Sequence, residues 1–160
     1  MDLPWPATGA GEVASYVQAF GKPVAAWRGF ENDRSVYSGS NESPIRPERV
    51  MQELQSRLTP ETIVFADANC SSMWVVGQLR GRKPGQRFFA PRDLAGHRWG
   101  LPLAIGAKVA RPSSPVVALV GDGGFAHGWA EIETMVRSNV AIVVIVLNNG
   151  VLGFRRTQRR

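Results

Sequence analysis

Two polar motifs in the sequence have the residue types and the spacing expected of a site that binds a phosphorylated ligand through a metal ion. The first is Gly121-Asp122-Gly123-Gly124 and the second is Asn148-Asn149-Gly150, with 27 residues from Asp122 to Asn149. Carboxylate, amide and carbonyl oxygens suit Mg²⁺ or Ca²⁺, which commonly share such sites with phosphate oxygens. Glycines let the backbone approach a ligand and turn N–H groups toward an anion. Together the motifs predict a metal–diphosphate site, although each alone is also a common turn sequence.

Each motif follows an apolar segment that is typical of a strand. Residues 116–120 and 141–147 are rich in valine and isoleucine, and residues 129–137 between them show helical spacing. A strand, a helix and a strand of these lengths predict a parallel βαβ unit, in which ligands bind at the carboxyl ends of the strands. We expect a tight turn at 121–124, a helix that begins near His127 and points at the site, and a second strand covered on both faces.

The preceding chain supplies further elements of the same kind. A helix is expected from Pro47 to just before Pro60, a strand over 62–66 that ends at Asp67, and helices near 72–79 and over 101–110. The fold class predicted is therefore α/β, a doubly wound parallel sheet. Residues 1–44 are rich in proline and glycine and are expected to be a linker or the remnant of a preceding domain, leaving 45–160 as one domain.

Composition excludes several classes of protein. The 160-residue chain has one cysteine, Cys70, and two histidines, His97 and His127, so disulfide frameworks, multi-cysteine zinc sites and histidine-rich metal centres are excluded. The longest apolar run, residues 140–147, is too short to cross a membrane, and no secretory signal is visible. These features favour a cytoplasmic protein that does not bind membranes.

Positive charge is concentrated rather than spread along the chain. The net charge is +6, and eight basic residues stand against one acidic residue between Arg80 and Arg111. The basic residues do not alternate with aromatic ones, as a surface that stacks nucleic-acid bases would require. Solvated loops are therefore favoured over a nucleic-acid partner.

A dinucleotide site is the competing interpretation of the glycines. Gly121-x-Gly123-x-x-Ala126 follows a predicted strand and matches the dinucleotide fingerprint. That fingerprint needs an acidic residue about 20 positions later for the ribose, where this chain has Asn148 and Asn149. A nucleotide-binding oxidoreductase domain is therefore kept as a less favoured alternative.

The spaced pair of motifs resembles the thiamine diphosphate-binding motif. The resemblance continues through Asp67 and residues 71–74, through 100–108 and through 131–134, and it covers roughly residues 44–156. In these segments the chain is similar to the diphosphate-binding domain of the acetolactate synthase-like enzymes. The fold implied is the thiamine diphosphate-binding fold, expected here to be incomplete at its C-terminus.

The resemblance implies a role for each matching residue. Asp122 and Asn149 would bind Mg²⁺ through side-chain oxygens and Val151 through its backbone carbonyl. Ser71 and Ser72 match diphosphate-contacting positions, although they could equally cap a helix. The full set of implied cofactor contacts is Ser71, Ser72, Gly96, His97, Gly121, Gly123, Gly124 and Asn149.

The activity implied is decarboxylation of a 2-oxo acid and addition of the product to a second carbonyl, with thiamine diphosphate and Mg²⁺ as cofactors. In this family the activating glutamate lies on a pyrimidine-binding domain, so no catalytic residue is expected in this chain, and the chain alone is expected to be inactive. The partner would be such a domain on the same or another chain, in a homodimer or tetramer. A non-catalytic, truncated fragment is the alternative.

Overall fold

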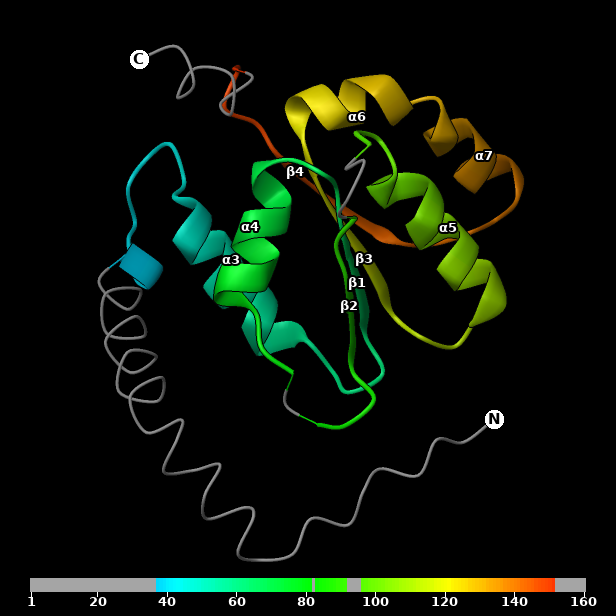
Figure 1. Cartoon of the computed structure of the whole chain (residues 1–160), viewed down its shortest axis with the longest axis horizontal. Coiled ribbons are helices and arrows are strands. Elements are labelled where there is room, and N and C mark those ends of the chain that lie inside the picture. The colour runs from blue at the N-terminus through cyan, green and yellow to red at the C-terminus, as the bar shows by residue number, and fades with distance from the viewer. Residues whose placement is uncertain (1–36, 82, 92–95, 152–160) are drawn as a thin grey trace, which may run out of the picture.

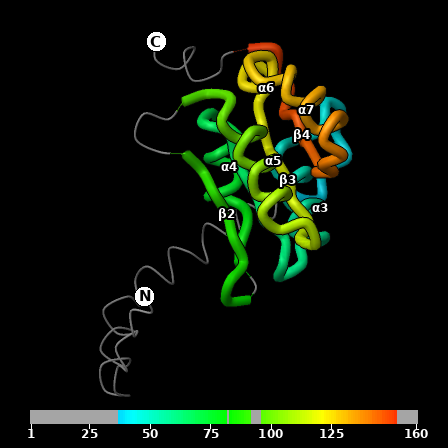
Figure 2. The backbone as a smooth tube through the Cα atoms, turned by 90° about the vertical axis from the view of Figure 1, so that its right-hand side faces the viewer, coloured from blue at the N-terminus to red at the C-terminus, as the bar shows by residue number. Residues whose placement is uncertain are grey.

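The protein contains a four-stranded sheet in which all strands are parallel. The computed structural model describes residues 37–81, 83–91 and 96–151. Within them the strands lie in the order β2-β1-β3-β4, with β2 and β4 at the two edges (Figure 2). The strands are β1 (Ile63–Ala66), β2 (Arg87–Phe89), β3 (Val116–Gly121) and β4 (Val143–Leu147). The predicted α/β class with a parallel sheet is confirmed.

Helices cover both faces of this sheet. On one face lie α3 (Pro47–Arg57) and α4 (Cys70–Gln78), and on the other lie α5 (Gly100–Ala110), α6 (Asp122–Gly128) and α7 (Glu131–Arg137) (Figure 1). The helix between β1 and β2 lies on one face, and the helices between the later strands lie on the other, so both faces are covered, as in a doubly wound sheet. The helices expected near 47–59, 72–79 and 101–110 are α3, α4 and α5.

The core is divided by the sheet into two layers of side chains. Val64 and Ala66 of β1 pack on the side of α3 and α4, whereas Ile63 and Phe65 pack on the side of α5. This alternation follows from the two-residue period of a strand. Because β1 and β3 are buried on both faces, their carboxyl ends are held in fixed positions by packing.

The structure differs from the sequence prediction at residues 122–128. The expected tight turn at 121–124 and the expected helix start near His127 are both wrong, because α6 begins at Asp122. Glycine is among the poorest helix formers, so Gly123, Gly124 and Gly128 concealed this short helix. Contacts with the end of β1 override the propensity, as described below.

Two strands also depart from expectation. β4 was predicted to be covered on both faces, yet Val143 is 58% and Val146 38% exposed, since β4 is an edge strand within the described residues. β2 was not predicted at all, because its three residues lie within a stretch rich in arginine and glycine. Phe89 of β2 stacks on Phe65 of β1 with ring centroids 4.8 Å apart, which secures this short edge strand.

The predicted boundary between a linker and a domain falls mostly outside the described residues. Of residues 1–44, the structure describes only 37–44, so the division at residue 44 stays a prediction. Among the described helices, none has the length and apolar character needed to cross a membrane.

Candidate functional site

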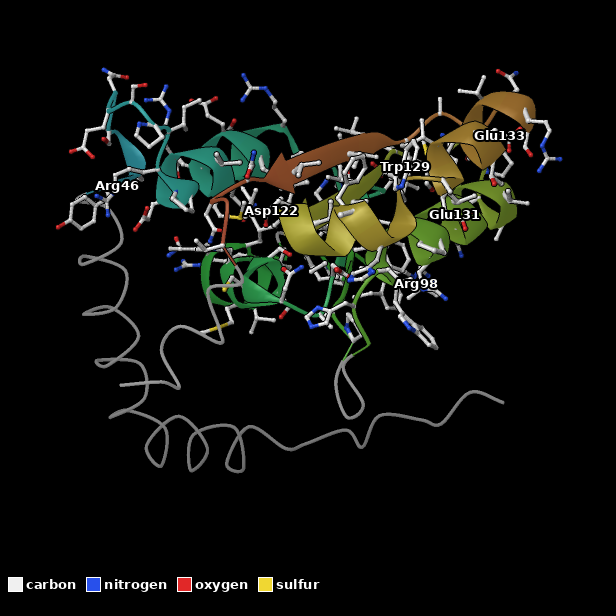
Figure 3. All side chains as sticks on the ribbon, turned by 90° about the horizontal axis from the view of Figure 1, so that it is seen from above. Arg46, Arg98, Asp122, Trp129, Glu131 and Glu133 are labelled. Carbon is white, nitrogen blue, oxygen red and sulfur yellow. The ribbon has the colours of Figure 1, made fainter. Side chains whose placement is uncertain are left out.

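The two polar motifs leave the sheet side by side. β3 and β4 pair in parallel with Gly121 opposite Leu147, so Asp122 and Asn148 follow at the same edge of the sheet. Gly121 keeps an extended backbone (φ −85°, ψ 162°) and Asp122 is the first residue of α6. Figure 3 shows Asp122 at the start of α6, beside the end of β4. The predicted meeting of the two motifs at one sheet edge is confirmed.

The carboxylate of Asp122 connects the motifs directly. Its Oδ2 accepts a hydrogen bond from the backbone N–H of Gly150 at 2.9 Å, and its Oδ1 accepts one from Gly123 at 2.9 Å. Gly150 has φ +65°, a left-handed conformation that favours glycine. The loop after β4 is therefore held against the start of α6 by one side chain.

The asparagines shape the same loop from within. Asn148 Oδ1 accepts from Gly150 N–H at 3.1 Å, and Asn149 Oδ1 accepts from Val151 N–H at 3.0 Å. Such side-chain-to-backbone bonds two residues ahead are typical of asparagine in turns. Both side chains are exposed, so Asn149 presents its amide at the surface of the site.

The amino end of α6 packs closely on the segment that follows β1. A Cβ atom at Gly124 would lie 2.0 Å from Asp67 Oδ2, and one at Gly121 would lie 3.0 Å from Asn69 Nδ2. Gly124 therefore requires glycine for packing within the protein, in addition to any approach of a ligand, whereas a side chain at Gly121 would have to displace Asn69 slightly. The sequence indicated only the approach of a ligand as a reason for these glycines.

Asp67 is the most deeply buried polar group at this edge. Its side chain is 0% exposed, and its carboxylate accepts hydrogen bonds from three donors. Arg98 N–H and Asn69 Nδ2 donate to Oδ2, each at 3.1 Å, and Gly100 N–H donates to Oδ1 at 3.2 Å. The sequence marked Asp67 as the end of a strand and as part of the family resemblance, with no role assigned, and Asn69 was not singled out at all.

Ser71 and Ser72 are buried in the first turn of α4. Asn69 caps this helix by accepting from Ser71 N–H at 2.7 Å, and it also accepts from the Ser71 hydroxyl. The Ser72 hydroxyl donates to the Asn69 carbonyl at 2.9 Å. Both hydroxyls thus serve the capping arrangement in this structure, and their contact with a diphosphate stays a prediction.

The segment 96–100 lies next to Asp67 and α6. Arg98 has φ +74°, and its Cβ would meet a Cβ placed on Gly128 at 3.6 Å. Figure 3 shows Arg98 near the end of α6 opposite to Asp122. Gly96 is packed on Trp99, whose Nε1 would lie 2.6 Å from an added Cβ, and His97 is exposed. Gly96 and His97 directly precede Arg98, which bonds to Asp67, and their contact with a cofactor stays a prediction.

The donor set at the motifs fits a hard divalent cation. Asp122 offers a carboxylate with lone pairs beyond its two backbone bonds, and Asn149 and Val151 offer amide and carbonyl oxygens in the loop that Asp122 holds. The described residues include no cluster of three or more histidine, cysteine, aspartate or glutamate side chains suited to a metal. A cation here would therefore take its remaining ligands from neutral oxygens, phosphate or water.

Comparison with known proteins shows what the chain is similar to. Residues 67–160 match the family described as "Thiamine pyrophosphate enzyme, C-terminal TPP binding domain". A probable acetolactate synthase large subunit of Methanococcus aeolicus is 31% identical over 141 residues, covering 81% of this chain and 23% of the relative.

Two further relatives are a second acetolactate synthase and a decarboxylase. The acetolactate synthase isozyme 2 large subunit of Escherichia coli is 31% identical over 67% of this chain and 19% of its own length. Benzoylformate decarboxylase of Pseudomonas aeruginosa is 32% identical over 71% of this chain and 21% of its own length. The chain thus spans about a fifth of the length of these curated relatives.

Proposed function

Because the chain belongs to the thiamine pyrophosphate enzyme family, in which it matches the C-terminal TPP-binding domain, we propose that it anchors the diphosphate of thiamine diphosphate through Mg²⁺. The observation that carries the proposal is the bond from Gly150 N–H to Asp122 Oδ2, which joins the two motifs at the carboxyl ends of β3 and β4. This is the edge at which parallel sheets bind ligands.

Each residue of the anchor has a distinct task. Asp122 contributes the negative charge that attracts the cation, and Asn149 and Val151 contribute neutral oxygens from the loop that Asp122 holds. Backbone N–H groups of Gly123 and Gly124 are assigned to the diphosphate, since amides in the first turn of a helix lack carbonyl partners within that helix. The N–H of Gly123 would exchange its bond to Asp122 Oδ1 for one to the diphosphate. Because β3 is buried, the start of α6 is held in place by packing, whereas Asn149 and Val151 lie in an exposed loop.

The reaction class proposed is that of an acetolactate synthase-like 2-oxo acid decarboxylase and carboligase. Its support is the mixture of acetolactate synthases and a decarboxylase among the relatives. When bound, thiamine diphosphate supplies the electron sink for decarboxylating a 2-oxo acid and passing the product to a second carbonyl. We assign the activating glutamate to a pyrimidine-binding domain, on this or another chain, in a dimeric or tetrameric enzyme.

Calorimetric titration of the purified chain with thiamine diphosphate tests the anchor. Binding is expected in Mg²⁺ and is expected to be lost on adding EDTA. Asp122→Ala should weaken binding in Mg²⁺ at least about tenfold, the range seen when groups that organise a metal site are removed. The matched control is Glu61→Ala, which removes an exposed carboxylate just before β1, at the opposite end of that strand from the site.

The outcomes separate the proposal from its alternatives. Metal-independent binding of thiamine diphosphate, or an unchanged affinity in Asp122→Ala, would contradict the anchor. Preferential binding of NAD would favour a nucleotide-binding oxidoreductase domain instead. A folded wild-type chain that binds neither ligand would favour the non-catalytic fragment.

A further inference from the structure

We propose that Asp67 is a positioning residue that holds the segment 96–100 against the amino end of α6, and so fixes the shape of the cofactor site. This inference rests on the proposed function, because Gly96, His97, Gly123 and Gly124 are residues assigned to the cofactor. Asp67 itself is assigned no contact with a ligand.

The first argument is the burial of a carboxylate that is satisfied mainly by backbone donors. Asp67 directly follows β1, its N–H donates to Leu119 O at 2.9 Å, and its side chain is 0% exposed. Burial of a carboxylate is costly unless hydrogen bonds satisfy its oxygens. Two of its three donors are backbone N–H groups of residues more than 30 positions away, Arg98 and Gly100. The carboxylate thus fixes a distant loop in addition to its local partner Asn69.

The second argument is the conformation of that loop. Arg98 adopts φ +74°, a left-handed conformation that is unfavourable for a residue other than glycine. Strained residues of this kind persist only where surrounding contacts impose them. Here the N–H of Arg98 itself, and that of Gly100 two residues later, both end on Asp67. The strained turn is therefore maintained by the Asp67 carboxylate.

The third argument is that the same carboxylate touches the other half of the site. A Cβ on Gly124 would lie 2.0 Å from Asp67 Oδ2, and a Cβ on Gly100 would lie 3.0 Å from Asp67 N. Asn69 Nδ2, bonded to Oδ2, lies 3.0 Å from the same Gly124 position. Asp67 is thus packed between α6, which carries the diphosphate-binding amides, and the turn that carries Gly96 and His97.

Asp67→Asn tests this role with little change of volume. The amide has one oxygen and one NH₂ group, so it cannot accept all three bonds. Its best orientation keeps oxygen toward Arg98 and Asn69 and turns NH₂ toward the N–H of Gly100. In the cofactor-free protein, hydrogen exchange of the Gly100 amide, measured by NMR, should be roughly three- to tenfold faster than in the wild type.

A binding measurement tests whether loss of the bond from Gly100 N–H weakens binding of the cofactor. In Mg²⁺, the dissociation constant of thiamine diphosphate should rise about 10- to 100-fold in Asp67→Asn. The control is Thr62→Val, which removes another buried acceptor near β1, the Thr62 Oγ1 that binds Thr59 N–H at 3.0 Å. Thr62→Val should lower thermal stability while leaving the affinity of the folded protein and the exchange at Gly100 unchanged.

The two readouts separate failure of this inference from failure of the proposed function. If Asp67→Asn and Thr62→Val lose similar stability, and both retain wild-type affinity and Gly100 protection, Asp67 is merely structural and the inference is wrong. If the wild type does not bind thiamine diphosphate, the proposed function fails, and the exchange at Gly100 alone decides whether Asp67 holds the turn.

Discussion

At the scale of single residues, the close contact between Gly124 and Asp67 predicts that adding a side chain at position 124 destabilises the protein. Gly124→Ala would place a Cβ 2.0 Å from Asp67 Oδ2, an oxygen held by two hydrogen bonds. Overpacking of this kind typically costs about 1–3 kcal/mol, so the free energy of unfolding in denaturant should fall by that amount. The same substitution should also weaken binding of thiamine diphosphate, because it moves the start of α6.

Gly106 in α5 provides the matched comparison. A Cβ added there would meet no atom within 4 Å, and the residue lies inside a helix. Gly106→Ala should therefore stabilise the protein by about 0.5–1 kcal/mol, since alanine is the better helix former. Equal effects of the two substitutions would mean that the close approach at Gly124 is not significant.

The residues of the site were predictable to different degrees. Asp122, Asn149 and the glycines stood out because unusual residue types recur after strands at a fixed spacing. The dependence of Gly124 on Asp67 was not predictable, because it joins residues 57 positions apart whose contact exists only in the folded chain. Asn69 was missed although its partners lie only two residues away: its side chain donates to Asp67 Oδ2 and accepts from Ser71 N–H. An asparagine directly before a helix is a typical N-cap, and this signal could have found it.

At the scale of elements, α3 carries two ion pairs of Glu53, with Arg49 and with Arg57, which predict that the stability of the protein depends on pH. Glu53 accepts a hydrogen bond from Arg57 and pairs with Arg49 at 3.0 Å, one helical turn to either side. The hydrogen bond from Arg57 is the main cause that holds the pKa of the Glu53 carboxyl below its ordinary value. A lowered pKa in the folded state adds stability above the unfolded-state pKa and loses it as the pH falls through the folded-state pKa.

Thermal unfolding as a function of pH tests the contribution of these ion pairs. The melting temperature of the wild type should fall more steeply than that of Glu53→Gln as the pH drops below the ordinary glutamate pKa. The difference should be small and should shrink in high salt, because the pair is solvent-exposed. A steeper acid decline in Glu53→Gln than in the wild type would contradict the assigned direction.

Elements also differ in how far the sequence determined them. α3 shows helical spacing of apolar residues, and β1 and β3 are short, continuous apolar runs. These elements, together with α4 and α5, were predicted within a few residues. α6 was missed because its glycines have low helix propensity and are retained by contacts with Asp67 and Asn69. The exposure of β4 was not predictable either, because its apolar composition matches a buried strand while its burial depends on neighbouring elements.

At the scale of the whole molecule, the sheet brings together groups that are distant in the chain. Asp67 follows β1, Asp122 follows β3 and Asn149 follows β4. Because these strands are parallel, all three residues lie on the side of the sheet where the strands have their carboxyl ends. The two-layer core keeps these strand ends fixed, whereas the site itself consists of short turns and helix starts. The molecule thus combines a rigid framework with a polar edge suited to a charged cofactor.

The central claim is that Asp122 couples the metal ion to the diphosphate. The most direct test is to measure the affinity for thiamine diphosphate over a series of Mg²⁺ concentrations, and that for Mg²⁺ over a series of cofactor concentrations. Linkage requires each ligand to raise the affinity for the other by the same factor. We predict a strong coupling factor in the wild type and one at least about tenfold smaller in Asp122→Ala. Equal coupling in the two proteins would contradict the claim.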